Sequence, residues 1–110
     1  MLKDKIVRVR LHKSFNEQRP MSFVGKCIAF NNYWVVVEGY GIMVTRSSKS
    51  GAQIDARPSQ NAIPNTNIES VRVLPDDFDY RRLQLSTEGQ QLVITVPNAQ
   101  PCFIGEIGEG

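Results

Sequence analysis

The fold is decided by the stretch FVGKCIAFNNYWVVVE, residues 23–38. Two segments rich in β-branched and aromatic residues, which favour strands, flank the pair Asn31-Asn32. Asparagine tolerates the left-handed backbone of tight turns, so the chain is expected to reverse direction at this pair. Gly25 has no side chain to pack, which in a strand indicates sharp curvature or a close approach of another backbone. The stretch therefore predicts a bent β-hairpin.

Other short strands are expected on both sides of this hairpin. Strict alternation in Ile6–Leu11 predicts a half-buried strand with Val7, Val9 and Leu11 on its apolar face. The expected strands are 6–11, 23–30, 33–38 with a continuation over 42–45 beyond a bulge, 68–73, and a C-terminal hairpin over 83–96. The expected connections are an exposed loop at 13–22, a long serine-rich loop or loose hairpin at 46–61, a turn at 64–67, and a polar connector or single helical turn at 76–82. No segment predicts a substantial helix, so the fold class is all-β.

The length of 110 residues leaves room for one small core. An apolar share of 41% and a charged share of 22% are close to globular averages, which disfavours wholesale disorder. We expect a barrel domain at 1–75 and an extension at 76–110. The extension comprises the connector, the hairpin and a flexible, acidic, glycine-bearing tail from residue 97 onward.

Membrane insertion and secretion are both disfavoured. The longest apolar run, Tyr33–Val37, has five residues, far below the ~20 needed to cross a bilayer. The first residues lack a hydrophobic signal region. Cys27 and Cys102 are too few for a disulfide framework and indicate reduced thiols. The sequence therefore predicts a cytoplasmic protein with no membrane partner.

The order of these motifs resembles the Sm/Lsm family, which includes bacterial Hfq. The residues that carry the resemblance are Val7–Leu11, Phe23-Val24-Gly25, the aromatic turn 30–34 leading into Val35–Val37, and the segment 63–68 leading into Val71 and Val73. The resemblance covers about residues 1–75 and rests on pattern, spacing and Gly25. It implies a small, strongly bent, five-stranded Sm-like (SH3-like) barrel. It also implies a homo-oligomeric ring of five to seven subunits, in which strand edges of neighbouring copies pair.

In this family single-stranded RNA binds around the central pore, at two turns. Carried over by position, the first turn gives Asn31, Asn32, Tyr33 and Trp34, and the second gives Pro64, Asn65, Thr66 and Asn67. The chain departs from the family at both turns. Asn31 stands where the family has aspartate, and Trp34 where it has a base-binding asparagine. Pro64 and Asn65 stand where the family has arginine and glycine, so the guanidinium is missing.

Each candidate residue also has a purely structural interpretation. Tyr33 and Trp34 could stack on unpaired bases, but adjacent strand residues point to opposite faces, so we expect one of them to be core. Asn65, Thr66 and Asn67 could bind base edges or simply form a turn. Arg8 and Arg10 lie on one strand face, which could contact phosphates or be a solvated face.

Enzyme chemistry is not predicted, and neither is a cofactor, a metal or a small-molecule substrate. His12 is the only histidine in the chain, so a histidine-based metal set cannot form. Asp76, Asp77 and Asp79 lack the glycine and distal glutamate of a calcium loop. No nucleophile, base and oxyanion donor assemble in the pattern.

Two functional hypotheses follow from the sequence. The first is an Sm-like ring that binds single-stranded RNA through the two turns, with Arg8 and Arg10 contacting phosphates. The second is an Sm-fold structural or assembly module without RNA binding, in which the hairpin at 83–96 docks subunits, rings or another protein.

Overall fold

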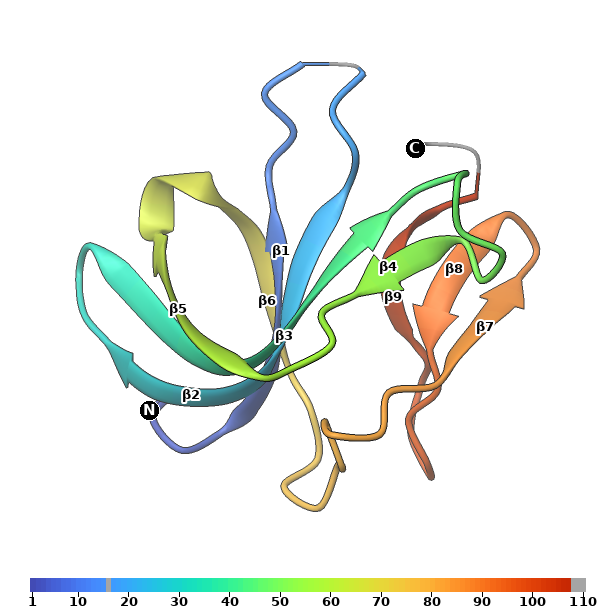
Figure 1. The fold of residues 1–110 in the computed structure, drawn as a ribbon. Coiled ribbons are helices and arrows are strands. Elements are labelled where there is room, and N and C mark those ends of the chain that lie inside the picture. Colours follow the sequence, from blue (N-terminus) through green and yellow to red (C-terminus); the bar gives the residue numbers. More distant parts are fainter. Residues whose placement is uncertain (16, 108–110) are drawn as a thin grey trace.

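A computed structural model describes residues 1–15 and 17–107, and nearly all of its regular secondary structure is antiparallel strand (Figure 1). The strands are β1 (Ile6–Leu11), β2 (Met21–Phe30), β3 (Trp34–Val44), β4 (Ala52–Ile54), β5 (Ser59–Pro64), β6 (Ile68–Val73), β7 (Leu85–Glu88), β8 (Gln91–Ile94) and β9 (Cys102–Glu106). A 3₁₀ turn, η1 (Asn65–Asn67), lies between β5 and β6. The predicted all-β class is confirmed. None of the described segments is a helix long and apolar enough to cross a membrane.

The main sheet has the strand order β4-β3-β2-β1-β6, and β5 also pairs with β3. It curls around its own inner face on the left of Figure 1. The backbones of β2 and β3 come very close at Gly25 and Gly39, which lie directly opposite each other. A Cβ atom on Gly25 would lie 2.7 Å from the Cα atom of Gly39. The close backbone approach predicted at Gly25 is therefore confirmed, and it needs glycine on both strands.

The main sheet is not a closed barrel. Among the described residues, β6 pairs only with β1, while β4 and β5 pair only with β3. The two ends of the sheet therefore do not meet. Within the described residues, the outer edges of β4 and β5 at one end and of β6 at the other have no partner strand.

Two sequence expectations along this sheet need correction. Gly39 and Gly41 do not interrupt β3, and the pairing irregularity lies instead in β2, between Cys27 and Ala29. The segment 46–61 is not one long loop, because it contains β4 and the start of β5. The alternative of a loose hairpin is confirmed for its first part, since β4 pairs with β3 across residues 45–51. The long strand β3 offers enough backbone to pair with both β4 and β5, which stabilises a segment whose composition indicates a loop.

The extension forms a second sheet, with the order β7-β8-β9, on the right of Figure 1. Strands β7 and β8 are the predicted hairpin. The expectation of a flexible tail is wrong for β9, since Cys102 and Ile104 are buried there. Residues 108–110 of the expected tail lie outside the described residues. The expected polar connector at 76–82 also contributes buried side chains, those of Phe78 and Tyr80.

The chain has two hydrophobic cores, one on each face of the main sheet. The inner core lies within the curl of the sheet and consists of Val7, Val9, Cys27, Val35, Val37 and Ile63. The second core lies between the two sheets. There Ile6, Val24, Ile42 and Val44 of the main sheet meet Leu92, Ile94, Cys102 and Ile104 of the second sheet. The predicted apolar face of β1 therefore faces the inner core, while its other face is covered by the extension.

Two arginines of the main sheet hold β9 in place. Arg8 of β1 donates a hydrogen bond to the carbonyl oxygen of Phe103 at 2.7 Å. Arg72 of β6 donates to the carbonyl oxygens of Pro101 at 2.7 Å and Gln100 at 2.6 Å. Charge-assisted hydrogen bonds of this kind are stronger than neutral ones. They bind carbonyl oxygens just before β9 and at its second residue.

The two thiols are expected to be inert in the folded protein and to make it less stable at alkaline pH. Burial raises the pKa of both Cys27 and Cys102, and the nearby guanidinium groups of Arg8 and Arg72 lower that of Cys102 to a smaller extent. A raised pKa in the folded state contributes stability that is complete below the ordinary thiol pKa of about 8.5 and is lost as pH rises above it. We expect the free energy of unfolding to fall between pH 8.5 and the raised pKa.

Urea unfolding from about pH 7 to 10 measures this effect. The part due to Cys102 should disappear in a Cys102→Ala variant, which serves as the control for lysine and tyrosine titration over the same range. Thiol labelling at pH 8 should be slow without denaturant. Fast labelling of the folded protein would contradict the burial of these groups.

Candidate functional site

The turn between β2 and β3 is held by Asn31. Its Oδ1 atom accepts hydrogen bonds from the backbone N–H groups of Tyr33 at 2.7 Å and Trp34 at 2.9 Å. The backbone N–H of Asn31 also donates to the carbonyl oxygen of Trp34 at 2.9 Å. The predicted chain reversal is confirmed. It is stabilised by the Asn31 side chain, which accepts hydrogen bonds from two backbone N–H groups of the turn. The Asn31 amide oxygen is therefore already engaged.

The second predicted turn lies directly beside the first. Pro64, the last residue of β5, pairs with Trp34, and η1 follows. The backbone N–H of Asn65 donates to the carbonyl oxygen of Tyr33 at 2.8 Å, and its Nδ2 atom donates to the carbonyl oxygen of Asn31 at 3.1 Å. The chain thus brings together two segments that are about thirty residues apart in sequence. We call residues 30–34 and 64–67 the turn cluster.

The turn cluster exposes three aromatic side chains. Tyr33 is 73% exposed, Trp34 45% and Phe30 41%. The expectation that either Tyr33 or Trp34 is core is wrong, because both lie at the end of the hairpin, beyond the inner core. Phe30 was not among the predicted site residues, and its place next to the turn was the signal that could have found it.

The polar side chains of the turn cluster differ in their availability. Asn32, Thr66 and Asn67 are exposed. The Oδ1 atom of Asn65 is buried and has no hydrogen-bond partner among the described residues. A buried acceptor without a donor costs free energy, so a donor from a ligand would be favourable there.

Arg8 and Arg10 lie away from the turn cluster and are not the solvated or phosphate-binding pair that the sequence indicates. Arg8 is only 7% exposed, and besides Phe103 it donates to the hydroxyl of Ser70 at 3.0 Å. Burial lowers the pKa of its guanidinium. The Arg10 side chain is 16% exposed, pairs with Glu69 at 3.4 Å and lies 4.5 Å from the centre of the Phe103 ring. Both predictions are wrong because β9 covers this face.

His12 is the basic residue of that strand region that reaches the turn cluster. It is exposed, and its backbone N–H donates to the carbonyl oxygen of Asn67 at 2.8 Å. In the sequence, His12 follows Arg8 and Arg10 at the same spacing of two residues. The pattern therefore does not show that His12 alone lies beside η1. The hydrogen bond places it next to η1.

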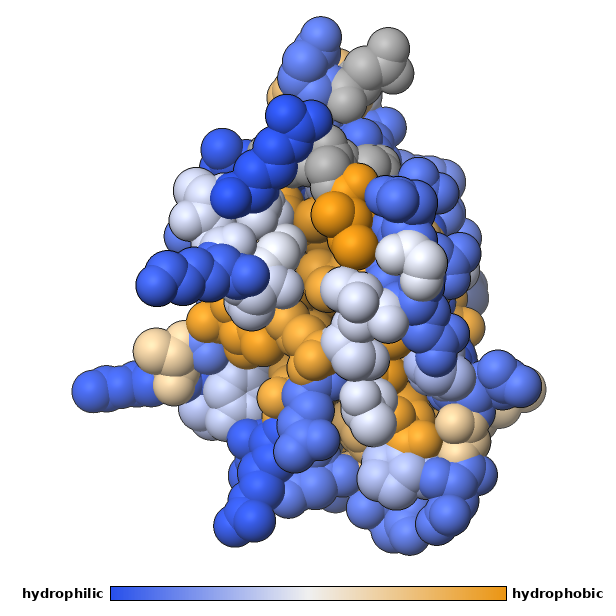
Figure 2. Space-filling view, turned by 90° about the vertical axis from the view of Figure 1, so that its right-hand side faces the viewer, coloured by the Kyte–Doolittle hydropathy of each residue, from blue (hydrophilic) through white to orange (hydrophobic). Residues whose placement is uncertain are grey.

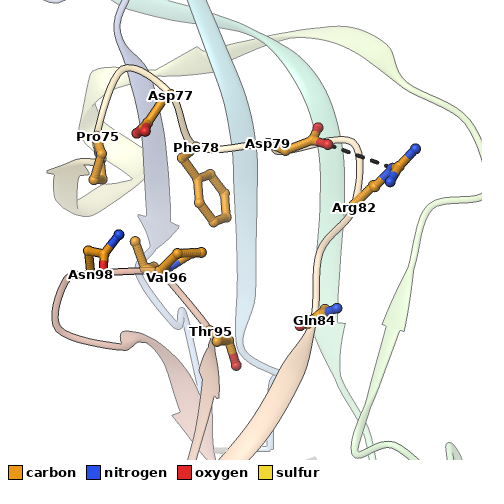
Figure 3. A pocket seen from close by; sticks show the side chains of 10 residues that line it. Pro75, Asp77, Phe78, Asp79, Arg82, Gln84, Thr95, Val96 and Asn98 are labelled. Carbon is orange, nitrogen blue, oxygen red and sulfur yellow. Dashed lines mark ion pairs between the residues drawn. The ribbon is translucent and has the colours of Figure 1, made fainter.

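A pocket of about 280 Å³ lies between the connector and the end of β8 (Figure 3). Phe78 forms one wall, and Asp77 and Asn98 approach it from opposite sides. Asp79 turns away and pairs with Arg82 at 3.7 Å. None of the predicted site residues lines this pocket. Within the described part of the chain, no three His, Cys, Asp or Glu side chains gather in a way that could hold a metal ion.

The geometry defines an all-β protein of two packed antiparallel sheets, with an exposed aromatic turn cluster at one end of the main sheet. Comparison with protein-family models, with curated proteins and with solved structures finds no match to this chain. The features of the chain that bear on its function are the turn cluster and the open main sheet.

Proposed function

We propose that this protein is an Sm-like ring-forming protein that binds single-stranded RNA at the turn cluster. The observation that carries the proposal is that Asn65 joins the two turns through hydrogen bonds to the carbonyl oxygens of Asn31 and Tyr33. These hydrogen bonds bring exposed aromatic rings and exposed amide and hydroxyl groups close together. Unpaired bases are recognised by this combination, through stacking and through hydrogen bonds to base edges.

Stacking is the main source of affinity in this proposal. Each base stacked on an aromatic side chain contributes ~1–3 kcal/mol, largely without regard to base identity. Asn31 is engaged in its own turn, and Arg8 and Arg10 are covered by β9. We therefore expect RNA binding with little base preference, in which Tyr33 is the leading contact and His12, next to η1, is a basic residue within the neighbourhood of the site.

The open ends of the main sheet are the reason for proposing a ring. The outer edge of β5 and the outer edge of β6 have no partner among the described residues. Unpaired edges are a liability that cyclic pairing between copies removes. Pairing β5 of one copy with β6 of the next would place several turn clusters around one axis, which multiplies weak stacking contacts on one RNA strand.

Substitution of Tyr33 tests the RNA proposal. Tyr33→Ala should weaken the binding of labelled oligo-U or oligo-A about tenfold at ~50 mM salt, because a stacking contact is lost. Tyr33→Phe keeps the ring and should stay within about twofold. Phe15→Ala removes another exposed aromatic side chain, in the loop between β1 and β2, and should have no effect.

Two results would contradict the proposal. If neither oligomer binds at ~50 mM salt, where phosphate contacts are strongest, the RNA function is wrong. Light scattering of the purified protein should give one discrete mass of five to seven copies. A stable monomer at high concentration would contradict the ring.

A second candidate function is an assembly module of the same fold without RNA binding. The burial of Arg8 and the partial burial of Arg10 favour it, because they leave these guanidinium groups poorly placed for phosphate contacts. The hairpin at 83–96 was expected to dock subunits or another protein. Its apolar residues instead pack against the main sheet of the same chain. A discrete ring that binds neither oligomer would support this function.

A further inference from the structure

The outer face of the main sheet is only partly covered by the second sheet. In β3, Tyr40, Ile42 and Val44 lie on this face, because all three contact the core between the two sheets. Alternate residues of a strand share a face, so Trp34 and Val36 also lie on the outer face. They are at the end of β3 that is far from the second sheet (Figure 1). The outer face is therefore open beside the turn cluster.

Cross-strand pairing extends this open part of the outer face over three strands. Trp34 pairs with Pro64 of β5. Val36 pairs with Ala29 of β2 on one side and with Ala62 of β5 on the other. Paired residues of antiparallel strands point to the same face, and we call these five residues the outer platform. Trp34 is 45% exposed and both alanines are exposed, so a ligand can reach the outer platform.

The inner face at the same end of the hairpin belongs to the inner core. Phe30 pairs with Val35, which pairs in turn with Ile63, so these three side chains lie on the inner face. Val35 and Ile63 are 5% and 4% exposed. Phe30 therefore lies beside buried residues, whereas Trp34 lies beside exposed ones.

The apolar surface near the second sheet differs from the outer platform in its accessibility. Figure 2 looks onto that side of the molecule and shows apolar surface that lies between polar residues. Val44 and Leu92 line a pocket there, but they are only 2% and 1% exposed. The outer platform, in contrast, has an open aromatic ring.

A polar row of residues ends the outer platform and keeps it small. Glu38 pairs with Lys26 on one side and with Gln60 on the other. Its carboxylate accepts a hydrogen bond from Gln60 Nε2 at 3.3 Å, and the Lys26 ammonium lies 3.9 Å from the Asp4 carboxylate. A stable protein interface takes about 20–30 residues from each partner. Five residues with small side chains around one indole ring therefore favour flat bases over a second protein.

We propose that single-stranded RNA continues from the turn cluster onto the outer platform, with one base stacked on Trp34 and the next over Val36. This inference rests on the proposed RNA function and adds the face of the sheet along which the RNA runs. Trp34 belongs to both the turn cluster and the outer platform, so the path is continuous. Aromatic side chains stack with any base, and the two alanines leave room for a flat ring above Val36. Phe30 takes no part, because it lies on the inner face.

Trp34 is the only tryptophan in the chain, so its fluorescence reports directly on the outer platform. Titration of the full-length protein with oligo-U at ~50 mM salt should quench this fluorescence, because a base stacks on the indole. The quenching should have the same midpoint as the anisotropy change of labelled oligo-U. The Phe30→Ala variant should show the same quenching and the same midpoint.

Substitutions on the two faces separate the outer platform from the rest of the hairpin. Trp34→Ala should weaken oligo-U binding about tenfold, and Phe30→Ala, the matched loss of an aromatic ring on the inner face, by less than about twofold. Ala62→Glu should weaken it about fivefold, because the new side chain covers the platform and repels phosphate. Thr87→Glu adds the same charge to an exposed strand residue of the second sheet and should have no effect. Thermal unfolding of each variant checks the fold.

The possible results distinguish this inference from the RNA function. If oligo-U binds without a change in Trp34 fluorescence, or if Phe30→Ala weakens binding as much as Trp34→Ala, the path over the outer platform is wrong and the RNA function stands. If oligo-U does not bind, the RNA function is wrong and the path falls with it. If the fluorescence instead changes with protein concentration alone, as the mass from light scattering rises, the outer platform is a contact between copies and the path is wrong.

Discussion

A Gly25→Ala variant is expected to be largely unfolded. The new Cβ atom would lie 2.7 Å from Gly39 Cα and closer still to the carbonyl oxygen of Glu38. These neighbours are backbone atoms of the paired strand, so no side-chain rotation can relieve the clash. The strands must separate where the main sheet bends, and we expect a loss of about 3 kcal/mol or more. That is a large part of the total stability of a small domain.

Urea unfolding followed by circular dichroism measures the loss. Gly89→Ala is the matched control, because Gly89 has a φ of +59° but no atom within 4 Å of a new Cβ. Only backbone strain opposes that change, at a cost of about 1 kcal/mol. Equal unfolding midpoints for the two variants would show that the close approach of β2 and β3 is not as described.

Replacement of Arg8 by alanine is expected to loosen the second sheet from the main one. The change removes the donors to the Phe103 carbonyl oxygen and the Ser70 hydroxyl, and it leaves a gap beside β9. Arg8 itself is buried, and part-buried acceptors that lose a charged donor are costly, so we expect a loss of about 3 kcal/mol. Amide hydrogen exchange should accelerate more in β8 and β9 than in β2 and β3.

Arg82→Ala provides the comparison for Arg8. The Arg82 side chain is 88% exposed, and its ion pair with Asp79 is open to solvent. Its removal should cost about 0.5 kcal/mol or less. If the two variants are equally stable, Arg8 does not anchor β9.

The parts of the fold that were predictable from sequence are those with a local cause. The hairpin at 23–38 was predictable because Asn31 forms the turn through its own side chain. The bend was predictable because Gly25 is the residue that a close backbone approach requires. In each case the decisive contacts lie within the hairpin itself.

The errors have long-range causes. The tail from residue 97 onward has the composition of a mobile segment, yet β9 is ordered by its pairing with β8 and by guanidinium groups from β1 and β6. The basic face of β1 was misjudged for the same reason, since Arg8 and Phe103 are 95 positions apart. Alternation shows that a strand has two faces, but it does not show what covers the second.

The two turns of the candidate site were predictable in their residues but not in their geometry. The resemblance indicated both turns, and the structure places them in contact. The exposure of Trp34 and the engagement of Asn31 depend on the turn's hydrogen bonds, which a residue pattern does not specify.

The bond between Arg8 and Phe103 also bears on how the molecule is made. During synthesis, β1 leaves the ribosome long before its partners β6 and β9 have been made. Until then, its Arg8 side chain and the apolar residues beside it stay exposed to water. Contacts between such distant positions slow folding. The nascent chain therefore cannot reach its final form until almost the whole of it has been translated.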